Sequence, residues 1–168
     1  MQTLEILTKS GQETKKLGEK LAKELMRSSY AKASEDKLKT AAVLSLEGDL
    51  GAGKTTFTQG FAKGLGIKEI PKSPTFVILQ IYHPPPLLTK EGIKGRFSNL
   101  VHVDAYRLKS ADFKALNWKD FIKDKKNIIL VEWGNKIKDI LPKNSLRILF
   151  EHNGHKGHLN RRLIKIIQ

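Results

Sequence analysis

The hydrophobic residues of this chain alternate between short continuous runs and longer segments in which they recur every three to four positions. The short runs have the length of β-strands, and they lie at residues 3–8, 41–48, 75–82, 100–104, 127–133, 145–152 and 161–168. The run at 41–48 is nearly free of polar residues, as is typical of a strand buried on both faces of a parallel sheet. The last two runs flank "NGHKGH" and are expected to close the sheet as a hairpin.

Helical spacing is clearest near the N-terminus, where Leu17, Leu21 and Leu25 share one face of a predicted helix. Ser10 and Glu13 form a capping box, in which each side chain satisfies a backbone N–H at the start of that helix. Helices are predicted over residues 11–26, 54 to about 64 and 110–122, and surface loops over 28–40 and the proline-containing segment 83–99. Strands that alternate with helices predict an α/β fold with a mainly parallel sheet.

Composition narrows the class of protein. The 168 residues, 39% of them hydrophobic, suit one domain with a single core, and we find no internal boundary. Cysteine is absent, which excludes disulfides, cysteine zinc sites and thiol nucleophiles. With no secretory signal and no long apolar run, the expectation is a soluble, cytoplasmic protein without membrane contact. The net charge of +14 is spread along the chain, so a solvated lysine-rich surface and a surface for nucleic acid both remain open.

The segment "GDLGAGKT" carries the clearest chemistry. Gly48, Gly53, Lys54 and Thr55 match G-x-x-x-x-G-K-[ST] without a substitution, between a predicted strand and a predicted helix. In such a loop backbone N–H groups curl around phosphates, which requires glycine where a side chain would block the approach. Lys54 would reach the β- and γ-phosphates, and the Thr55 hydroxyl would bind Mg²⁺. A complete match in this position favours a phosphate cradle over a turn that resembles one by chance.

The nucleotide is predicted to be ATP, bound with Mg²⁺. A guanine-binding switch protein would carry D-x-x-G and N-K-x-D motifs. No aspartate of this chain is followed by glycine three positions later, and "NWKD" at 117–120 has a different interior. Nothing in the sequence therefore specifies guanine.

Two acidic residues follow apolar runs and are candidates for the chemistry of phosphoryl transfer. Asp104 ends "LVHVD" and Glu132 ends "IILVE", and ligands of parallel α/β sheets bind beyond the carboxyl ends of strands. The sequence leaves open which of them holds Mg²⁺ and which orients the attacking water. His102 is interpreted as a core residue rather than a site residue, whereas Trp133 fits packing and a site contact equally well. Asp49 would assist water or metal, or cap the amides of its own loop.

Four separated motifs make the chain resemble the TsaE family, also called YjeE. They are "LEGDLGAGKTTFTQGFAKGLGI" (46–67), "SPTF" (73–76), "HVDAYRL" (102–108) and "VEWG" (131–134), in the order and spacing of that family. The segment "GQETKKLGEKLAKEL" also resembles the family's first helix, with Thr14 at its recurrent threonine. Loop 83–99 is longer than usual, and Asn117 stands where many members have glycine, which leaves the partner-docking surfaces less defined.

The resemblance implies a single P-loop ATPase domain over residues 1–168, with a mixed, mainly parallel sheet flanked by helices. Members bind ATP with Mg²⁺ and hydrolyse it slowly. They associate with the proteins that transfer a threonylcarbamoyl group to the adenosine next to the tRNA anticodon, and the ATPase is thought to reset that complex. Whether tRNA is contacted directly or only through those partners stays open.

The resemblance also implies the roles of individual residues. Lys54, Glu132 and Asp104 would be the catalytic residues, and Thr55, Glu132 and Asp104 would lie at Mg²⁺. The nucleotide would be bound by Thr14, Gly48, Asp49, Leu50, Gly51, Ala52, Gly53, Lys54, Thr55, Thr56, Thr75 and Trp133. Of these, Thr75 belongs to a switch-like segment and Thr14 would lie near the base.

Two other functions compete with this one. A small-molecule P-loop kinase would suit the size and the cradle, but such kinases use arginine-rich lids, and arginines are few here, with only Arg161 and Arg162 adjacent. A basic tRNA-binding module with secondary nucleotide binding would suit the net charge, but no RNA-binding motif accompanies it.

Overall fold

A computed structural model describes residues 2–31, 40–73, 78–86, 88–89, 92–93, 97–152 and 161–167. Its main element is a seven-stranded sheet in the order β1-β9-β8-β2-β7-β6-β3. The strands are β1 (Thr3–Thr8), β2 (Ala42–Gly48), β3 (Leu79–Tyr82), β6 (Asn99–Asp104), β7 (Asn127–Glu132), β8 (Leu146–His152) and β9 (Arg162–Ile167). The helices are α1 (Gly11–Ala31), α2 (Lys54–Gly64) and α3 (Trp118–Lys123), with 3-10 segments η1 (Ser110–Lys114) and η2 (Gly134–Ile140).

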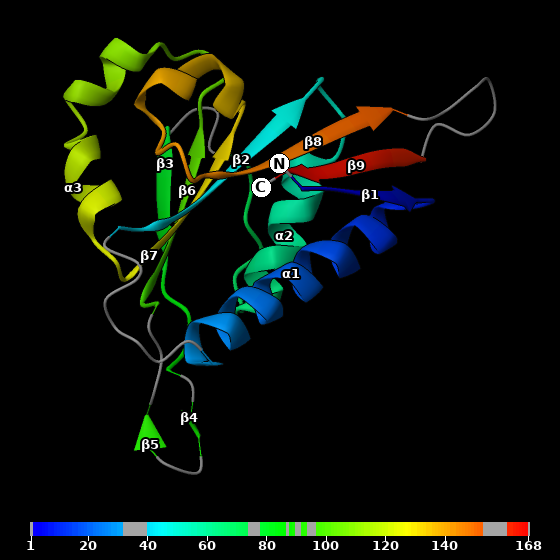
Figure 1. Ribbon diagram of the computed structural model, residues 1–168, viewed down its shortest axis with the longest axis horizontal. Helices are drawn as coiled ribbons and strands as arrows, with labels where there is room; N and C mark the ends of the chain where they lie inside the picture. The colour runs from blue at the N-terminus through cyan, green and yellow to red at the C-terminus, as the bar shows by residue number, and fades with distance from the viewer. Residues whose placement is uncertain are drawn as a thin grey trace.

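The centre of the sheet is parallel and its edges are antiparallel. β2 lies between β7 and β8, and β6 continues on the far side of β7, all four strands running in one direction. The antiparallel pairs are β1 with β9, β8 with β9, and β3 with β6. This arrangement confirms the predicted mixed, mainly parallel α/β sheet and the C-terminal hairpin. Thr3 pairs with Ile167, so the two ends of the chain lie side by side (Figure 1).

Helices cover both faces of the sheet (Figure 1). On one face α1 and α2 pack together over the apolar residues of the central strands, with Phe57 and Phe61 of α2 fully buried. On the other face η1, α3 and η2 cover a second cluster, which contains Phe113 and Trp118. Successive side chains of a strand point to opposite faces, so the nearly continuous apolar run of β2 serves both clusters.

Several predicted bounds differ from the structure. The first helix continues beyond its predicted end at Met26 to Ala31. The predicted helix over 110–122 is split into η1 and α3 at Asn117, whose φ of 51° is left-handed. The segment expected to be a loop at 83–99 contains a two-stranded antiparallel pair, β4 (Leu88–Thr89) with β5 (Gly92–Ile93). Of the predicted strand at 75–82, residues 75–77 lie outside the described part of the chain.

Candidate nucleotide-binding site

The G-x-x-x-x-G-K-T segment joins the end of β2 to the start of α2. Gly48, Gly51 and Gly53 have φ values of 139°, 76° and 103°, a region that side chains strongly disfavour. Gly53 is the N-cap of α2, and no side-chain hydrogen bond from the described residues caps the helix there. The first N–H groups of α2 therefore remain directed at the loop's concave side, where the helix dipole favours an anion. This backbone matches the cradle that the motif predicts.

Arg162, at the start of β9, lies against this loop. A Cβ on Gly53 would come within 2.7 Å of Arg162 Nε, so the arginine side chain would have to shift to accommodate any other residue there. The arginine is nearly buried, and its backbone oxygen accepts a hydrogen bond from Thr8 Oγ1 at 3.5 Å. A positive charge beside a phosphate cradle suits an anionic ligand. Sequence reasoning missed this residue, because only the pairing of β9 with β8 brings it to the loop.

Lys54 is held inside the loop by oxygen atoms. Its Nζ donates to the carbonyl oxygens of Gly48 at 2.7 Å and Asp49 at 2.8 Å. Lys54 as a whole is only 4% exposed. Burial lowers the pKa of Lys54 below its ordinary 10.5, while the nearby charges of Glu132, Asp104 and Asp49 act in the opposite direction. The ammonium also lies 3.8 Å from the centre of the Trp133 ring, in cation–π contact.

The two predicted carboxylates are neighbours. Asp104 and Glu132 are paired in the parallel register of β6 and β7, so their side chains project from the same face of the sheet, the face that α2 covers. Thr55 Oγ1 donates to Glu132 Oε2 at 3.0 Å. Asp104 accepts from Ser73 Oγ and from the backbone N–H of Tyr106, both at 2.8 Å. The structure thus brings Lys54, Thr55, Glu132 and Asp104 to one end of the sheet.

His102 is buried, as its interpretation as a core residue predicts, and it also contacts one of the two carboxylates. It is fully buried within β6, and its Nε2 lies 2.9 Å from Glu132 Oε1. Both oxygens of Glu132 are therefore engaged, one by His102 and the other by Thr55. The sequence held one signal for this contact, because His102 is the only polar residue in the apolar run "LVHV".

Trp133 lies beside the phosphate loop because its backbone turns sharply after β7. Its φ is 61°, a left-handed value that is rare for a bulky residue, and its backbone N–H donates to Leu46 O of β2 at 2.8 Å. The ring packs against Tyr106, with 4.9 Å between centroids, and Lys136 Nζ lies 4.6 Å from the centre of the Tyr106 ring. Strained backbone of this kind is common at functional sites.

The remaining predicted residues lie at different distances from this centre. Thr14 is buried at the start of α1, where its hydroxyl contacts Thr8 Oγ1 and Ser10 O, and among the described residues it makes no hydrogen bond to the loop. Leu50 projects outward with 78% of its surface exposed, and Asp49 is also exposed. Ala52 is buried, whereas Thr56 lies on α2 opposite Gly11 of α1. Thr75 lies outside the described residues.

The oxygen donors of this site suit Mg²⁺ rather than a softer metal. Thr55, Glu132 and Asp104 offer a hydroxyl and two carboxylates, and Mg²⁺ in phosphate sites takes few protein ligands and completes its shell with phosphate and water. Over the described ranges no group of three or more His, Cys, Asp and Glu side chains could by itself hold a metal.

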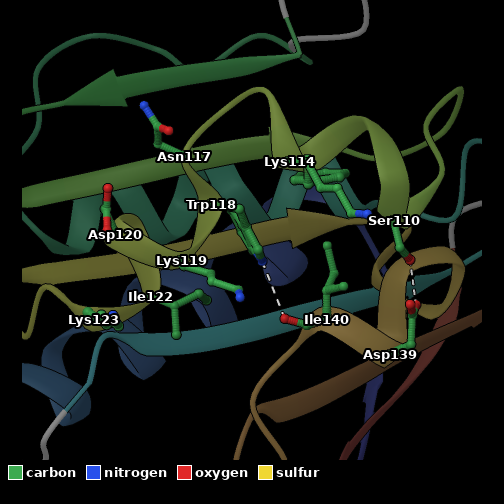
Figure 2. Close-up of a pocket in the computed structure, with 11 residues that line it drawn as sticks. Ser110, Lys114, Asn117, Trp118, Lys119, Asp120, Ile122, Lys123, Asp139 and Ile140 are labelled. Carbon is green, nitrogen blue, oxygen red and sulfur yellow. Dashed lines mark hydrogen bonds between the residues drawn. The ribbon is translucent and has the colours of Figure 1, made fainter.

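A separate cavity of about 730 Å³ lies on the other face of the sheet, among η1, α3 and η2. Figure 2 shows two hydrogen bonds among the lining residues. Trp118 Nε1 donates to the backbone oxygen of Ile140, and Ser110 Oγ donates to Asp139 Oδ1. None of the residues predicted to bind nucleotide lines this cavity. The cavity is therefore separate from the phosphate loop.

Comparisons with known proteins agree with this geometry. Residues 8–163 match the family model described as "Threonylcarbamoyl adenosine biosynthesis protein TsaE". The tRNA threonylcarbamoyladenosine biosynthesis protein TsaE of Bacillus subtilis (strain 168) is 41% identical over 112 residues, which are 67% of this chain and 63% of that protein. The protein of the same name from Aquifex aeolicus is 35% identical over 136 residues, 80% of this chain and 79% of its own length.

The fold has a solved counterpart. The crystal structure of Bacillus subtilis YdiB matches with a TM-score of 0.64 and 32% identity, covering 98% of this chain and 84% of that one. No helix within the described part of the chain is long and apolar enough to cross a membrane.

Proposed function

This chain belongs to the TsaE family, and from that premise we propose that it binds ATP with Mg²⁺ and hydrolyses it slowly in support of tRNA threonylcarbamoyladenosine formation. The observation that carries the proposal is the contact between Thr55 Oγ1 and Glu132 Oε2 at 3.0 Å. It joins the hydroxyl of the phosphate loop to a carboxylate at the end of a neighbouring strand, which is how P-loop NTPases hold Mg²⁺.

The phosphates and Mg²⁺ would be bound by different groups of the loop and the neighbouring strand. The N–H groups of the loop and of the first turn of α2 bind the phosphates. Lys54 exchanges the carbonyl oxygens of Gly48 and Asp49 for phosphate oxygens, since both are acceptors for the same ammonium. Mg²⁺, when bound, neutralises charge that develops on the phosphate oxygens. Its ligands from the protein would be Thr55 and Glu132, whose contact supports this assignment.

Asp104 is proposed to orient the attacking water. It lies beside Glu132 in the register of β6 and β7 but receives its hydrogen bonds from Ser73 and the Tyr106 N–H instead of from Thr55. A carboxylate held in this way can accept a proton from a water that lies between it and the γ-phosphate. The ring of Trp133 lies beside Lys54 and packs against Tyr106, next to the loop that would bind the phosphates.

Two measurements test the proposal. Purified protein should hydrolyse ATP only with Mg²⁺, and Lys54→Ala should abolish turnover while leaving the fold intact, as judged by circular dichroism. In cells that lack their own family member, the unchanged chain should restore threonylcarbamoyladenosine in tRNA and Lys54→Ala should not. Restoration by Lys54→Ala would separate the tRNA role from ATP chemistry and refute the proposal.

The competing functions have their own readouts. A kinase would convert a nucleoside, nucleotide or cofactor to a phosphorylated product faster than it releases phosphate to water. A tRNA-binding module would bind tRNA alone with a steep dependence on salt concentration. Association with the proteins that transfer the threonylcarbamoyl group, rather than with free tRNA, is the result that the proposal expects.

A further inference from the structure

His102 stands in a strand where packing alone would call for an apolar residue. Its neighbours along β6 are Leu100, Val101 and Val103, all completely buried, and its partner in the register of β7 is Leu130. A leucine would fill this place without the desolvation cost of an imidazole. A buried polar residue in such surroundings needs a compensating contact, and His102 has one on the face of the sheet that carries the carboxylates.

That contact is specific in its geometry. His102 Nε2 lies 2.9 Å from Glu132 Oε1, while the other oxygen of the same carboxylate accepts from Thr55 at 3.0 Å. Glu132 is only 2% exposed, so water contributes little to holding it. Two donors on two different oxygens fix the plane of the carboxylate, which could otherwise rotate about its last side-chain bond.

The second ring nitrogen identifies the donor. His102 Nδ1 is buried and has no hydrogen-bond partner among the described residues. A carboxylate oxygen can only accept, so the proton belongs on Nε2, which leaves on Nδ1 a lone pair that costs less to bury than an unpaired N–H. We assign this tautomer from the hydrogen-bond network. In it Nε2–H donates to Glu132 Oε1, and the contact orients the carboxylate.

We propose that His102 is a positioning residue, whose Nε2–H holds one oxygen of Glu132 so that the other stays directed at Thr55 and the start of α2, where Mg²⁺ would bind. The inference rests on the proposed function, because it assigns His102 a part in the same site. Partners of this kind set the affinity of a ligand for its metal, and their loss typically costs about 10–100-fold in metal affinity or activity.

Three substitutions separate orientation from packing. His102→Leu keeps the volume and removes the donor, His102→Gln keeps a donor N–H near the position of Nε2, and His102→Asn keeps the polarity but is too short to reach Glu132. Leu100→Ala is the matched control, because Leu100 is buried on the same strand without any polar role. It should lower thermal stability and leave the dependence on Mg²⁺ unchanged.

The readout that matters is Mg²⁺ dependence, measured on the full chain. Binding of a fluorescent ADP analogue is titrated with Mg²⁺, and ATP turnover is measured separately at saturating ATP. His102→Leu and His102→Asn should raise the half-saturating Mg²⁺ concentration and lower kcat, each by about 10–100-fold, with affinity for the analogue unchanged in the absence of Mg²⁺. His102→Gln should recover most of both losses. Combined with Glu132→Gln, the His102 substitutions should add no further loss.

Each result decides something. If His102→Leu or His102→Asn folds and keeps the Mg²⁺ dependence of the unchanged protein, or if His102→Gln is as impaired as they are, His102 acts only through packing and the inference is overturned. Should His102→Leu fail to fold, the Asn and Gln variants still give the comparison. If the unchanged protein binds no ADP analogue with Mg²⁺, both the proposed function and this inference fail.

Discussion

The hydroxyl of Thr55 and the carboxylate of Glu132 lie 3.0 Å apart although 77 residues separate them in the chain. Thr55 belongs to the first turn of α2, and Glu132 is the last residue of β7, the strand that lies beside β2. The contact therefore depends on β2, because β2 leads through the phosphate loop to Thr55 and pairs with β7, which carries Glu132. The consequences of this contact can be measured.

Glu132→Gln keeps the shape of the side chain and removes its charge. We expect turnover of ATP to fall by at least about 100-fold, together with a higher Mg²⁺ requirement, because the carboxylate lies beside the Thr55 hydroxyl. Glu47→Gln is the matched control, since Glu47 is also buried but is held by Ser45 and Arg147 on the opposite face of the sheet. Its turnover should remain close to that of the unchanged protein.

Asp104→Asn should behave differently from Glu132→Gln. If Asp104 orients the water, its variant loses kcat at saturating Mg²⁺ while the half-saturating Mg²⁺ concentration stays in place. The measurement is a titration of ATP turnover with Mg²⁺ for both variants in parallel. A raised Mg²⁺ requirement in Asp104→Asn, with none in Glu132→Gln, would reverse the two assignments.

The chain has two tryptophans, and only Trp133 is in contact with Lys54. Phosphate binding should draw the ammonium away from the Trp133 ring and so change the intrinsic fluorescence. We expect Trp118→Phe to retain the full fluorescence change on addition of ADP with Mg²⁺, and Trp133→Phe to lose it. If Trp118→Phe loses the fluorescence change and Trp133→Phe retains it, the nucleotide affects the cavity of Figure 2, which Trp118 lines.

The buried charge of Lys54 is expected to lower the free energy of unfolding of the protein. Burial holds its pKa below the ordinary 10.5, so the folded protein binds this proton more weakly than the unfolded chain does. The resulting destabilisation is fully present below the folded-state pKa and disappears as the pH rises toward 10.5. Lys54→Met should therefore unfold at a higher temperature than the unchanged protein at pH 7, by roughly 2–4 °C for each kcal/mol relieved.

The pH series provides the check on Lys54. The difference in unfolding temperature between Lys54→Met and the unchanged protein should narrow as the pH increases, because the unchanged protein loses its buried charge. Lys143→Met removes an exposed lysine and should show no such trend. A gap that widened with pH would contradict the assigned direction of the pKa.

Close packing of α1 on α2 gives a prediction about stability. A Cβ on Gly60 of α2 would lie 2.0 Å from the backbone oxygen of Lys15 in α1, where neither backbone can move aside cheaply. Gly60→Ala should lower the free energy of unfolding by about 1–3 kcal/mol, measured by urea denaturation. Gly11→Ala is the control, since a Cβ there meets only the Thr56 methyl at an ordinary 3.7 Å. Equal stability of the two variants would contradict the packing argument.

The sequence alone determined the class of fold, the phosphate loop and the candidate carboxylates, because each depends on local order along the chain. The apolar runs marked the strands, the glycine spacing marked the cradle, and Asp104 and Glu132 could be found as the ends of apolar runs. Helix bounds were less accurate, since Asn117 interrupts a helix that periodicity treats as continuous.

Tertiary structure decided which of these residues meet. The register of β6 with β7 set Asp104 beside Glu132 and brought His102 within reach of the same carboxylate, and hairpin pairing brought Arg162 to Gly53. Such contacts depend on strand order and on one-residue register, and neither is written in the hydrophobic pattern of any single segment. For this reason the sequence indicates only that His102 is a core residue, and the fold adds that its Nε2 lies 2.9 Å from Glu132 Oε1.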